Sequence, residues 1–163
     1  IPLDPYYLAS KAREYDFHAR FIELAAEVNE RMPYYVISRI MEVLNARGKS
    51  LNGARVLVLG AAYKKDAGDI RESPSLKLIQ LLQKKGASVS YNDPYIPNIQ
   101  LPDGSLSSVD FAEKNLSSVD CVVIATDHSC YNLEQIVAQS KLVFDTRGAT
   151  RGLKRENIVR LGE

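Results

Sequence analysis

The feature that most constrains this chain is a long stretch without glycine, residues 17–47. Apolar residues recur along it at intervals of three and four, which is the spacing of one helix face: Phe21, Leu24, Val28, Met32, Val36, Ile40 and either Val43 or Leu44. At 1.5 Å per residue, a single helix of this length would extend about 46 Å. That is longer than a compact domain of this size is wide, so part of the helix must project or pair.

A second apolar stripe widens the face of the same helix and comprises Ile22, Ala26, Pro33, Ile37 and Met41. One small neighbouring domain does not easily cover so wide a face, and we therefore expect a partner chain. Pro33 lacks the N–H that would bond to the Asn29 carbonyl, which predicts a kink or local unwinding. Whether that kink has any function is left open. Upstream, Asp4 and Pro5 predict the start of a shorter helix over residues 4–15.

From residue 55 onwards, short apolar runs alternate with helical patterns. Strands are predicted over 55–60, 87–91, 121–126 and 141–145, and helices over 74–85 and 132–139. Alternating buried strands and helices predict a Rossmann-like parallel sheet with flanking helices, preceded by the long helix. We therefore divide the chain into a helical dimerisation segment, residues 1–50, and an α/β domain, residues 51–163. Residues 92–119 are predicted to be loop, with one short helix near 110–114.

Composition narrows the classes of partner. The chain has 21 Lys and Arg against 20 Asp and Glu, and the lack of a basic excess argues against nucleic acid. No apolar stretch approaches the roughly 18 residues of a membrane span, and the start lacks a signal sequence, so we expect a cytoplasmic protein without membrane contact. Two cysteines and two histidines predict reduced thiols and no metal site.

Parallel sheets bind ligands beyond the carboxyl ends of their strands. The loop after the first predicted strand, GAAYKKDAGDIRE, has thirteen residues and lacks the G-x-G-x-x-G turn of dinucleotide folds. Before a helix start at Ser73 it carries three cations, Lys64, Lys65 and Arg71, opposite Asp66 and Asp69. The cations and the helix N-terminus together favour a phosphorylated ligand. The alternative is that these charges pair with one another in a solvated loop.

Three other strand ends carry candidate residues. Arg147 follows the last predicted strand and offers a guanidinium to phosphate or carboxylate, or an ordinary surface ion pair. Asp127, His128 and Cys130 resemble part of a nucleophilic site, but no third orienting group is identifiable, so a catalytic role is not favoured. Asp93 lies where a ribose-binding acid would lie in a dinucleotide fold. Because a proline follows it, we prefer a turn.

Five segments, in this order and at these intervals, resemble a known family. They are IPLDPYYLASKA, GAAYKKDAGDIRESPSLKLI, YNDPYIP, DCVVIATDH and FDTRG. They are similar to the C-terminal portion of the UDP-glucose/GDP-mannose dehydrogenase family, and YNDPYIP with RESPSLKL looks more like its UDP-N-acetylhexosamine branch. The chain begins with Ile rather than Met, and we interpret it as a fragment of a longer protein.

The resemblance implies an NAD-dependent oxidoreductase of polysaccharide biosynthesis. Such enzymes oxidise the C6 alcohol of a UDP-sugar to a carboxylate in two hydride transfers, with a cysteine that holds a thiohemiacetal and then a thioester. The family's NAD-binding domain and cysteine would precede residue 1. This chain alone is therefore expected to be inactive.

The resemblance also assigns roles to six residues. Asp4 would be catalytic, holding the water and lysine network beside the cysteine, and Arg71 would reach the NAD pyrophosphate. Four residues would contact the substrate: Ile1, Tyr63, Lys64 and Arg147. The long helix would form a homodimer. A second interpretation remains open, in which the chain is a non-catalytic α/β binding and assembly module.

Overall fold

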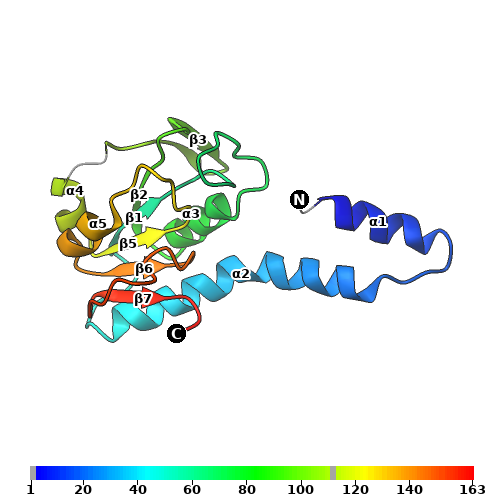
Figure 1. Ribbon diagram of the computed structural model, residues 1–163, viewed down its shortest axis with the longest axis horizontal. Helices are drawn as coiled ribbons and strands as arrows, with labels where there is room; N and C mark the ends of the chain where they lie inside the picture. Colours follow the sequence, from blue (N-terminus) through cyan, green and yellow to red (C-terminus); the bar gives the residue numbers. More distant parts are fainter. Residues whose placement is uncertain (1–2, 111–112) are drawn as a thin grey trace.

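A parallel sheet forms the centre of the fold in the computed structural model, which describes residues 3–110 and 113–163 (Figure 1). Its five strands lie in the order β2 (Ser88–Asn92), β1 (Arg55–Leu59), β5 (Cys121–Ile124), β6 (Val143–Asp145) and β7 (Ile158–Arg160). Each neighbouring pair is parallel. The Rossmann-like α/β class predicted from the sequence is confirmed.

Successive residues of β1 point to opposite faces of the sheet and so build two separate cores. Val56 and Val58 pack in one core with α2 (Arg20–Asn45) and α3 (Pro74–Lys84). Leu57 and Leu59 pack in the other with α4 (Glu113–Ser118) and α5 (Leu133–Gln139). This period of two explains why a fully buried strand reads as an unbroken apolar run. The sheet is therefore covered by helices on both sides.

The start of α3 follows the capping pattern of its sequence. Ser73 is the N-cap, and its hydroxyl oxygen accepts a hydrogen bond from the Ser75 N–H at 3.3 Å. Pro74 occupies the first helical position, where a missing N–H costs nothing. The Ser73 hydroxyl also donates to the Ala61 carbonyl at 2.7 Å. The helix start is thereby tied to the beginning of the loop that follows β1.

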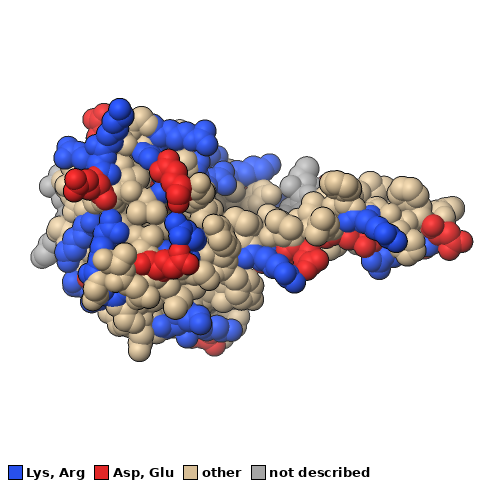
Figure 2. All heavy atoms as spheres, turned by 90° about the horizontal axis from the view of Figure 1, so that it is seen from below, with Lys and Arg blue, Asp and Glu red and all other residues tan. Residues whose placement is uncertain are grey.

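Helix α2 is shorter than the predicted 17–47 and continues through Pro33, so of the two outcomes predicted at that residue, a kink or local unwinding, the unwinding is wrong. Its second half is part of the core, where Ile40 and Leu44 are buried. Its first half projects as an arm, visible in Figures 1 and 2. Helix α1 (Leu3–Arg13) lies along this arm, joined to α2 by a hydrogen bond from the Tyr6 hydroxyl to Glu30 at 2.7 Å.

The prediction of loop over residues 92–119 is wrong in part. Two strands, β3 (Asn98–Leu101) and β4 (Gly104–Ser107), form an antiparallel hairpin there. Ile99 and Leu101 alternate inward, the period-two pattern of a strand covered on one face. The described part of helix α4, Glu113–Ser118, extends beyond the predicted 110–114, and strand β7 was not predicted because it is short and only half-buried.

Candidate functional site

The loops after β1 and β5 meet at the place where the connections between strands switch from one face of the sheet to the other. The connection from β1 runs through α3 on one face to β2, whereas the connection from β5 runs through α5 on the other face to β6. The carboxyl ends of β1 and β5 are therefore a topological switch point, the place where open α/β sheets bind their ligands. The loop of residues 60–73 and the loop of residues 125–132 border it.

The two loops touch at their base. Gly60 has a φ of +87°, and a Cβ at this residue would lie 2.4 Å from the Thr126 Cβ. Glycine is required there both by the backbone conformation and by the close approach. The Thr126 hydroxyl donates to the Ala62 carbonyl at 2.7 Å, which fastens one loop to the other.

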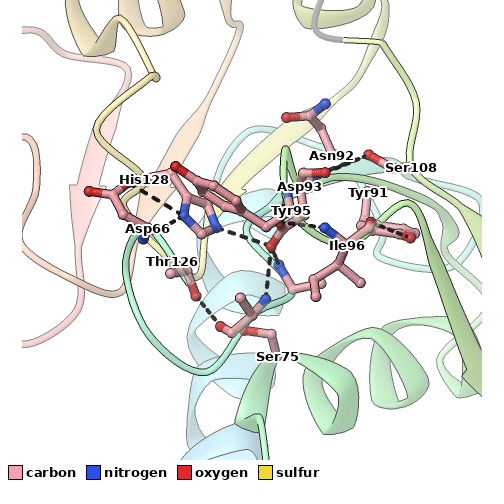
Figure 3. Close-up of polar contacts among 12 residues, drawn as sticks. Asp66, Ser75, Tyr91, Asn92, Asp93, Tyr95, Ile96, Ser108, Thr126 and His128 are labelled. Atoms are coloured by element: carbon pink, nitrogen blue, oxygen red, sulfur yellow. Dashed lines mark hydrogen bonds and ion pairs between the residues drawn. The ribbon is translucent and has the colours of Figure 1, made fainter. Parts of the chain in front are cut away.

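Asp93, at the end of β2, is the buried centre of this edge (Figure 3). Its Oδ2 accepts the N–H groups of Ala61 at 2.7 Å and Ala62 at 2.8 Å and lies 3.0 Å from Nε2 of His128. Its Oδ1 accepts the N–H groups of Tyr95 at 2.8 Å and Ile96 at 3.1 Å. The bond to Tyr95 is the turn that the sequence predicted. With five partners, this carboxylate is fully occupied by the protein itself.

A charged cluster lies above the switch point. Asp127 accepts two cations from different loops, Lys65 with Nζ 3.8 Å from its Oδ2 and Arg147 with Nε 3.6 Å from its Oδ1. Lys64, which precedes Lys65 in the sequence, is exposed. About half of the Lys65 and Arg147 side-chain surfaces is exposed, so these ion pairs are weak and open at little cost.

Other charges of the same loop pair locally. Arg71 donates to both oxygens of Asp69, at 3.0 and 2.9 Å, and these hydrogen bonds lower the pKa of Asp69 to about 2. Asp66 instead accepts the N–H and hydroxyl of Ser129, which lower the pKa of Asp66. The expectation of self-pairing is therefore met between Arg71 and Asp69, whereas Asp66 joins the β1 loop to the β5 loop.

The loop that carries Arg147 is fixed by hydrogen bonds to the buried carboxylate of Asp145. The Asp145 carboxylate accepts the Arg147 N–H at 2.9 Å and both the N–H and hydroxyl of Thr150 at 2.7 Å. Burial alone would raise the pKa of Asp145, but these hydrogen bonds outweigh it and the pKa is lowered. Arg160, from β7, donates to the carbonyls of Thr150 and Leu153. This support was not predicted from the sequence, since the partner Thr150 lies five residues beyond Asp145.

The residues assigned by resemblance fall into two groups. Tyr63 and Lys64 belong to the β1 loop of the switch point, where Tyr63 is half-buried and its N–H donates to the Asp69 carbonyl at 2.8 Å, and Arg147 belongs to the neighbouring loop after β6. Asp4 is exposed in the first turn of α1, on the arm. Ile1 lies outside the described residues.

A groove of about 1120 Å³ lies between α1, α2 and the start of α3. Its walls include Pro5 and Tyr6 of α1, several residues of α2, and the segment Glu72, Ser73 and Pro74 that begins α3. Arg71 and Asp4 do not line it, but each is the sequence neighbour of a lining residue, Glu72 and Pro5.

The β1 loop does not fit a dinucleotide. A pyrophosphate-binding turn needs helix N–H groups directly after the strand, whereas α3 begins at residue 74, fifteen positions after β1 ends at residue 59. The acid that would bind a ribose, Asp93, is occupied by its five partners. An NAD site centred on this sheet is therefore not supported; Arg71, the one residue that the resemblance assigns to NAD, is exposed.

The two cysteines occupy different environments and neither forms a disulfide. Cys121 is buried in β5, and burial raises the pKa of its thiol to about 12. Cys130 is exposed, but both ring nitrogens of the nearby His128 have other partners. Among residues 3–110 and 113–163, no three His, Cys, Asp or Glu side chains are grouped to hold a metal ion. Within those residues no helix is both long and apolar enough to span a membrane.

Comparison with known proteins points to one family. Residues 57–152, more than half of the chain, match the family described as "UDP-glucose/GDP-mannose dehydrogenase family, UDP binding domain". A UDP-N-acetyl-D-mannosamine dehydrogenase of Methanococcus maripaludis (strain C7) is 34% identical over 155 residues, which cover 90% of this chain and 34% of that protein. The chain thus spans about a third of the length of this curated relative.

Solved structures agree with that result. The UDP-D-ManNAc dehydrogenase of Pyrococcus horikoshii superposes with a TM-score of 0.78 and 30% identity, covering 99% of this chain and 37% of that one. A GDP-mannose dehydrogenase of Pseudomonas aeruginosa superposes with a TM-score of 0.77 over 98% of this chain and 38% of that one. Its identity of 19% makes it a likeness of fold alone.

Proposed function

The chain belongs to the UDP-glucose/GDP-mannose dehydrogenase family, and from this we propose that it is the nucleotide-sugar-binding and assembly part of an NAD-dependent UDP-sugar 6-dehydrogenase. Relatives named for UDP-N-acetyl-D-mannosamine support the UDP-N-acetylhexosamine branch. The observation that carries the proposal is the switch point, where Lys64 and the Lys65–Asp127–Arg147 cluster come from three loops to one edge.

The substrate is bound through its nucleotide. Lys64 and the guanidinium of Arg147 neutralise the diphosphate, and Arg147 exchanges its 3.6 Å pair with Asp127 for a phosphate oxygen. Tyr63, half-buried next to Lys64, provides an aromatic face to the nucleotide sugar. The resemblance assigns Ile1, which lies outside the described residues, to the sugar-binding site. These roles rest on the family resemblance together with the location of the two loops.

The reaction of the whole enzyme needs groups that this chain lacks. Oxidation of the C6 alcohol to a carboxylate transfers two hydrides to two NAD⁺ and consumes one water, with a cysteine carrying the aldehyde-level carbon as thiohemiacetal and then thioester. Cys121 is buried and Cys130 has no base available in His128, so neither is the nucleophile. The chain alone is expected to be inactive, with Asp4 holding the catalytic water once the cysteine is supplied.

NAD is bound mainly outside this chain. Arg71, whose side chain is 85% exposed, extends to the cofactor pyrophosphate from its pair with Asp69. That pair lies in solvent and is therefore weak enough to exchange for a phosphate. Two unpaired thiols are compatible with a reducing compartment, and we place the protein in the cytoplasm.

Calorimetric titration with UDP tests the nucleotide site. Lys64→Ala is expected to weaken UDP binding by roughly tenfold to a hundredfold, because a hydrogen bond to a charged group contributes about 1.5–3 kcal/mol. Lys154→Ala, which removes an exposed lysine after the Arg147 loop, is the matched control and is expected to bind as the parent chain does. Equal affinity of Lys64→Ala and the parent chain would remove Lys64 from the site.

We also propose that the arm forms a homodimer. Phe21, Leu24 and Val28 are spaced along one face of α2 and are 88%, 55% and 53% exposed. Such a stripe is stabilised when a second copy covers it. Leu24→Asp is expected to halve the sedimenting mass, whereas Asn45→Asp, an exposed substitution at the other end of α2, leaves it unchanged. A Leu24→Asp protein that sediments like the parent chain would refute this interface.

The rival function, a non-catalytic binding and assembly module, is favoured by one observation. Arg71 and Lys65 both have carboxylate partners within the protein, as a solvated loop without a ligand would. This alternative predicts that the chain dimerises but shows no heat of binding with UDP, GDP or AMP.

A further inference from the structure

His128 lies at the centre of the switch point without reaching its surface. The side chain has no exposed area, and its ring lies between the rings of Tyr95 and Tyr131, with centroid distances of 5.1 and 5.6 Å. Figure 3 shows the imidazole between Asp66 and Asp93, which come from the loops after β1 and β2. A residue so enclosed does not touch a ligand, so any part in binding acts through its neighbours.

The hydrogen-bond partners assign the state of the ring. Nδ1 accepts the backbone N–H of Asp66 at 3.0 Å, so Nδ1 carries no hydrogen. Nε2 lies 3.0 Å from Oδ2 of Asp93, an acceptor, so Nε2 carries the hydrogen and donates it. The neutral Nε2–H tautomer is the form that satisfies both contacts.

These contacts fix residues 63–65 at both ends. On the N-terminal side, the N–H groups of Ala61 and Ala62 donate to Asp93, the same carboxylate that accepts from His128. On the C-terminal side, Asp66 is fixed through its N–H to His128 and through its carboxylate to the N–H and hydroxyl of Ser129, at 2.8 and 2.6 Å. Only residues 63–65, which carry the proposed ligand contacts, lie between the two anchors.

We propose that His128 is a positioning residue that, through the Nδ1 bond to the Asp66 N–H, fixes residues 63–65 in the conformation that binds the nucleotide diphosphate. The proposal rests on the proposed function, because it names what prepares that site. Its physical basis is preorganisation: a loop that is already ordered loses less conformational entropy when the ligand binds. A histidine that only filled the core would affect stability without any preference for one nitrogen.

Two substitutions separate the nitrogens. In His128→Asn the side-chain oxygen replaces Nδ1 and retains an acceptor for Asp66, whereas the donor to Asp93 is lost. In His128→Gln the terminal amide replaces Nε2 and retains the donor to Asp93, whereas the acceptor for Asp66 is lost. Both variants lose the same ring between Tyr95 and Tyr131, so each serves as the control for the other.

The test combines UDP titration with amide hydrogen exchange on the purified chain. We expect His128→Gln to weaken UDP binding about tenfold and to speed exchange at residues 63–66, and His128→Asn to stay within about twofold of the parent chain. Equal losses in both variants, or none in either, would overturn the proposal. In the parent chain, ¹⁵N spectra of His128 should show a hydrogen-bearing Nε2 and a bare Nδ1; the reverse would also overturn it.

The same design separates the two levels of inference. If the parent chain does not bind UDP, the proposed function fails. Hydrogen exchange and the ¹⁵N spectra still decide whether Nδ1 fixes residues 63–66, because neither measurement needs a ligand.

Discussion

Replacing Asp93 with asparagine should cost a large part of the chain's stability. The substitution keeps the shape of the side chain but replaces one oxygen by an NH₂ group, which donates and cannot accept. Oδ2 has three donors and Oδ1 has two. Whichever way the amide turns, at least two buried donors therefore lose their acceptor.

The size of the effect follows from that count. A buried donor left without an acceptor costs about 1–3 kcal/mol, so two of them cost about 2–6 kcal/mol. Domains of this kind are stable by about 5–15 kcal/mol in total. With a urea slope of about 2 kcal/mol per molar, a loss of about 4 kcal/mol lowers the denaturation midpoint by about 2 M.

Urea denaturation followed by circular dichroism measures this loss. Asp103→Asn is the matched control, since Asp103 is exposed in the turn between β3 and β4 and the same substitution there should change stability by less than about 0.5 kcal/mol. If the free energy of unfolding of Asp93→Asn lies within about 0.5 kcal/mol of that of the parent chain, the five-partner account of Asp93 is refuted.

Three further predictions concern other parts of the fold. In native protein at pH 8, iodoacetamide should modify Cys130 and spare Cys121, whose buried thiol has its pKa raised to about 12, and mass spectrometry finding Cys121 modified would contradict its burial. Gly60→Ala should destabilise the chain by more than the roughly 1–2 kcal/mol of a left-handed backbone, since its Cβ would meet atoms at 2.4 to 2.7 Å. Gly53→Ala is the control, because Gly53 has a φ of +78° and nothing within 4 Å, so that only the backbone conformation is strained. Equal melting temperatures of Gly60→Ala and Gly53→Ala would refute the close contact with Thr126. The folded pKa of Asp145 is lowered, so its stabilisation is complete above the ordinary value of 3.8 and is lost as pH falls through the folded value. Urea denaturation should show a constant difference in the free energy of unfolding between the parent chain and Asp145→Asn from pH 7 to 5. This difference should narrow below pH 3.8, and a difference that does not narrow would contradict the lowered pKa of Asp145.

The elements that could be predicted from sequence are those whose signal is local. The apolar run of β1, ending in Gly60, and the Ser73 cap followed by Pro74 each fix an element through neighbouring residues, and both are found as expected. The hairpin of β3 and β4 was missed because its apolar residues are few and alternate with polar ones in a region rich in turn formers. Strand β7 has three half-buried residues and is a strand only because it pairs with β6.

The candidate site could be predicted only as a set of strand ends. Lys64 and Arg147 were identified from motifs that follow strands, and the parallel sheet explains why such residues share an edge. The partners of His128 could not be predicted, because Asp66 and Asp93 lie 62 and 35 residues away and only the strand order β2, β1, β5 brings them together. Asp127 was read beside Cys130, whereas its contacts are with Lys65 and Arg147.

The central claim is that the switch point between β1 and β5 binds the nucleotide of a UDP-sugar. Backbone amide NMR during titration of the chain with UDP, GDP and AMP tests it most directly. The account predicts saturable shifts with UDP at Tyr63, Lys64 and Arg147, and weaker ones with GDP and AMP. Absence of any response at these three residues, in a chain whose spectrum shows it folded, would contradict it.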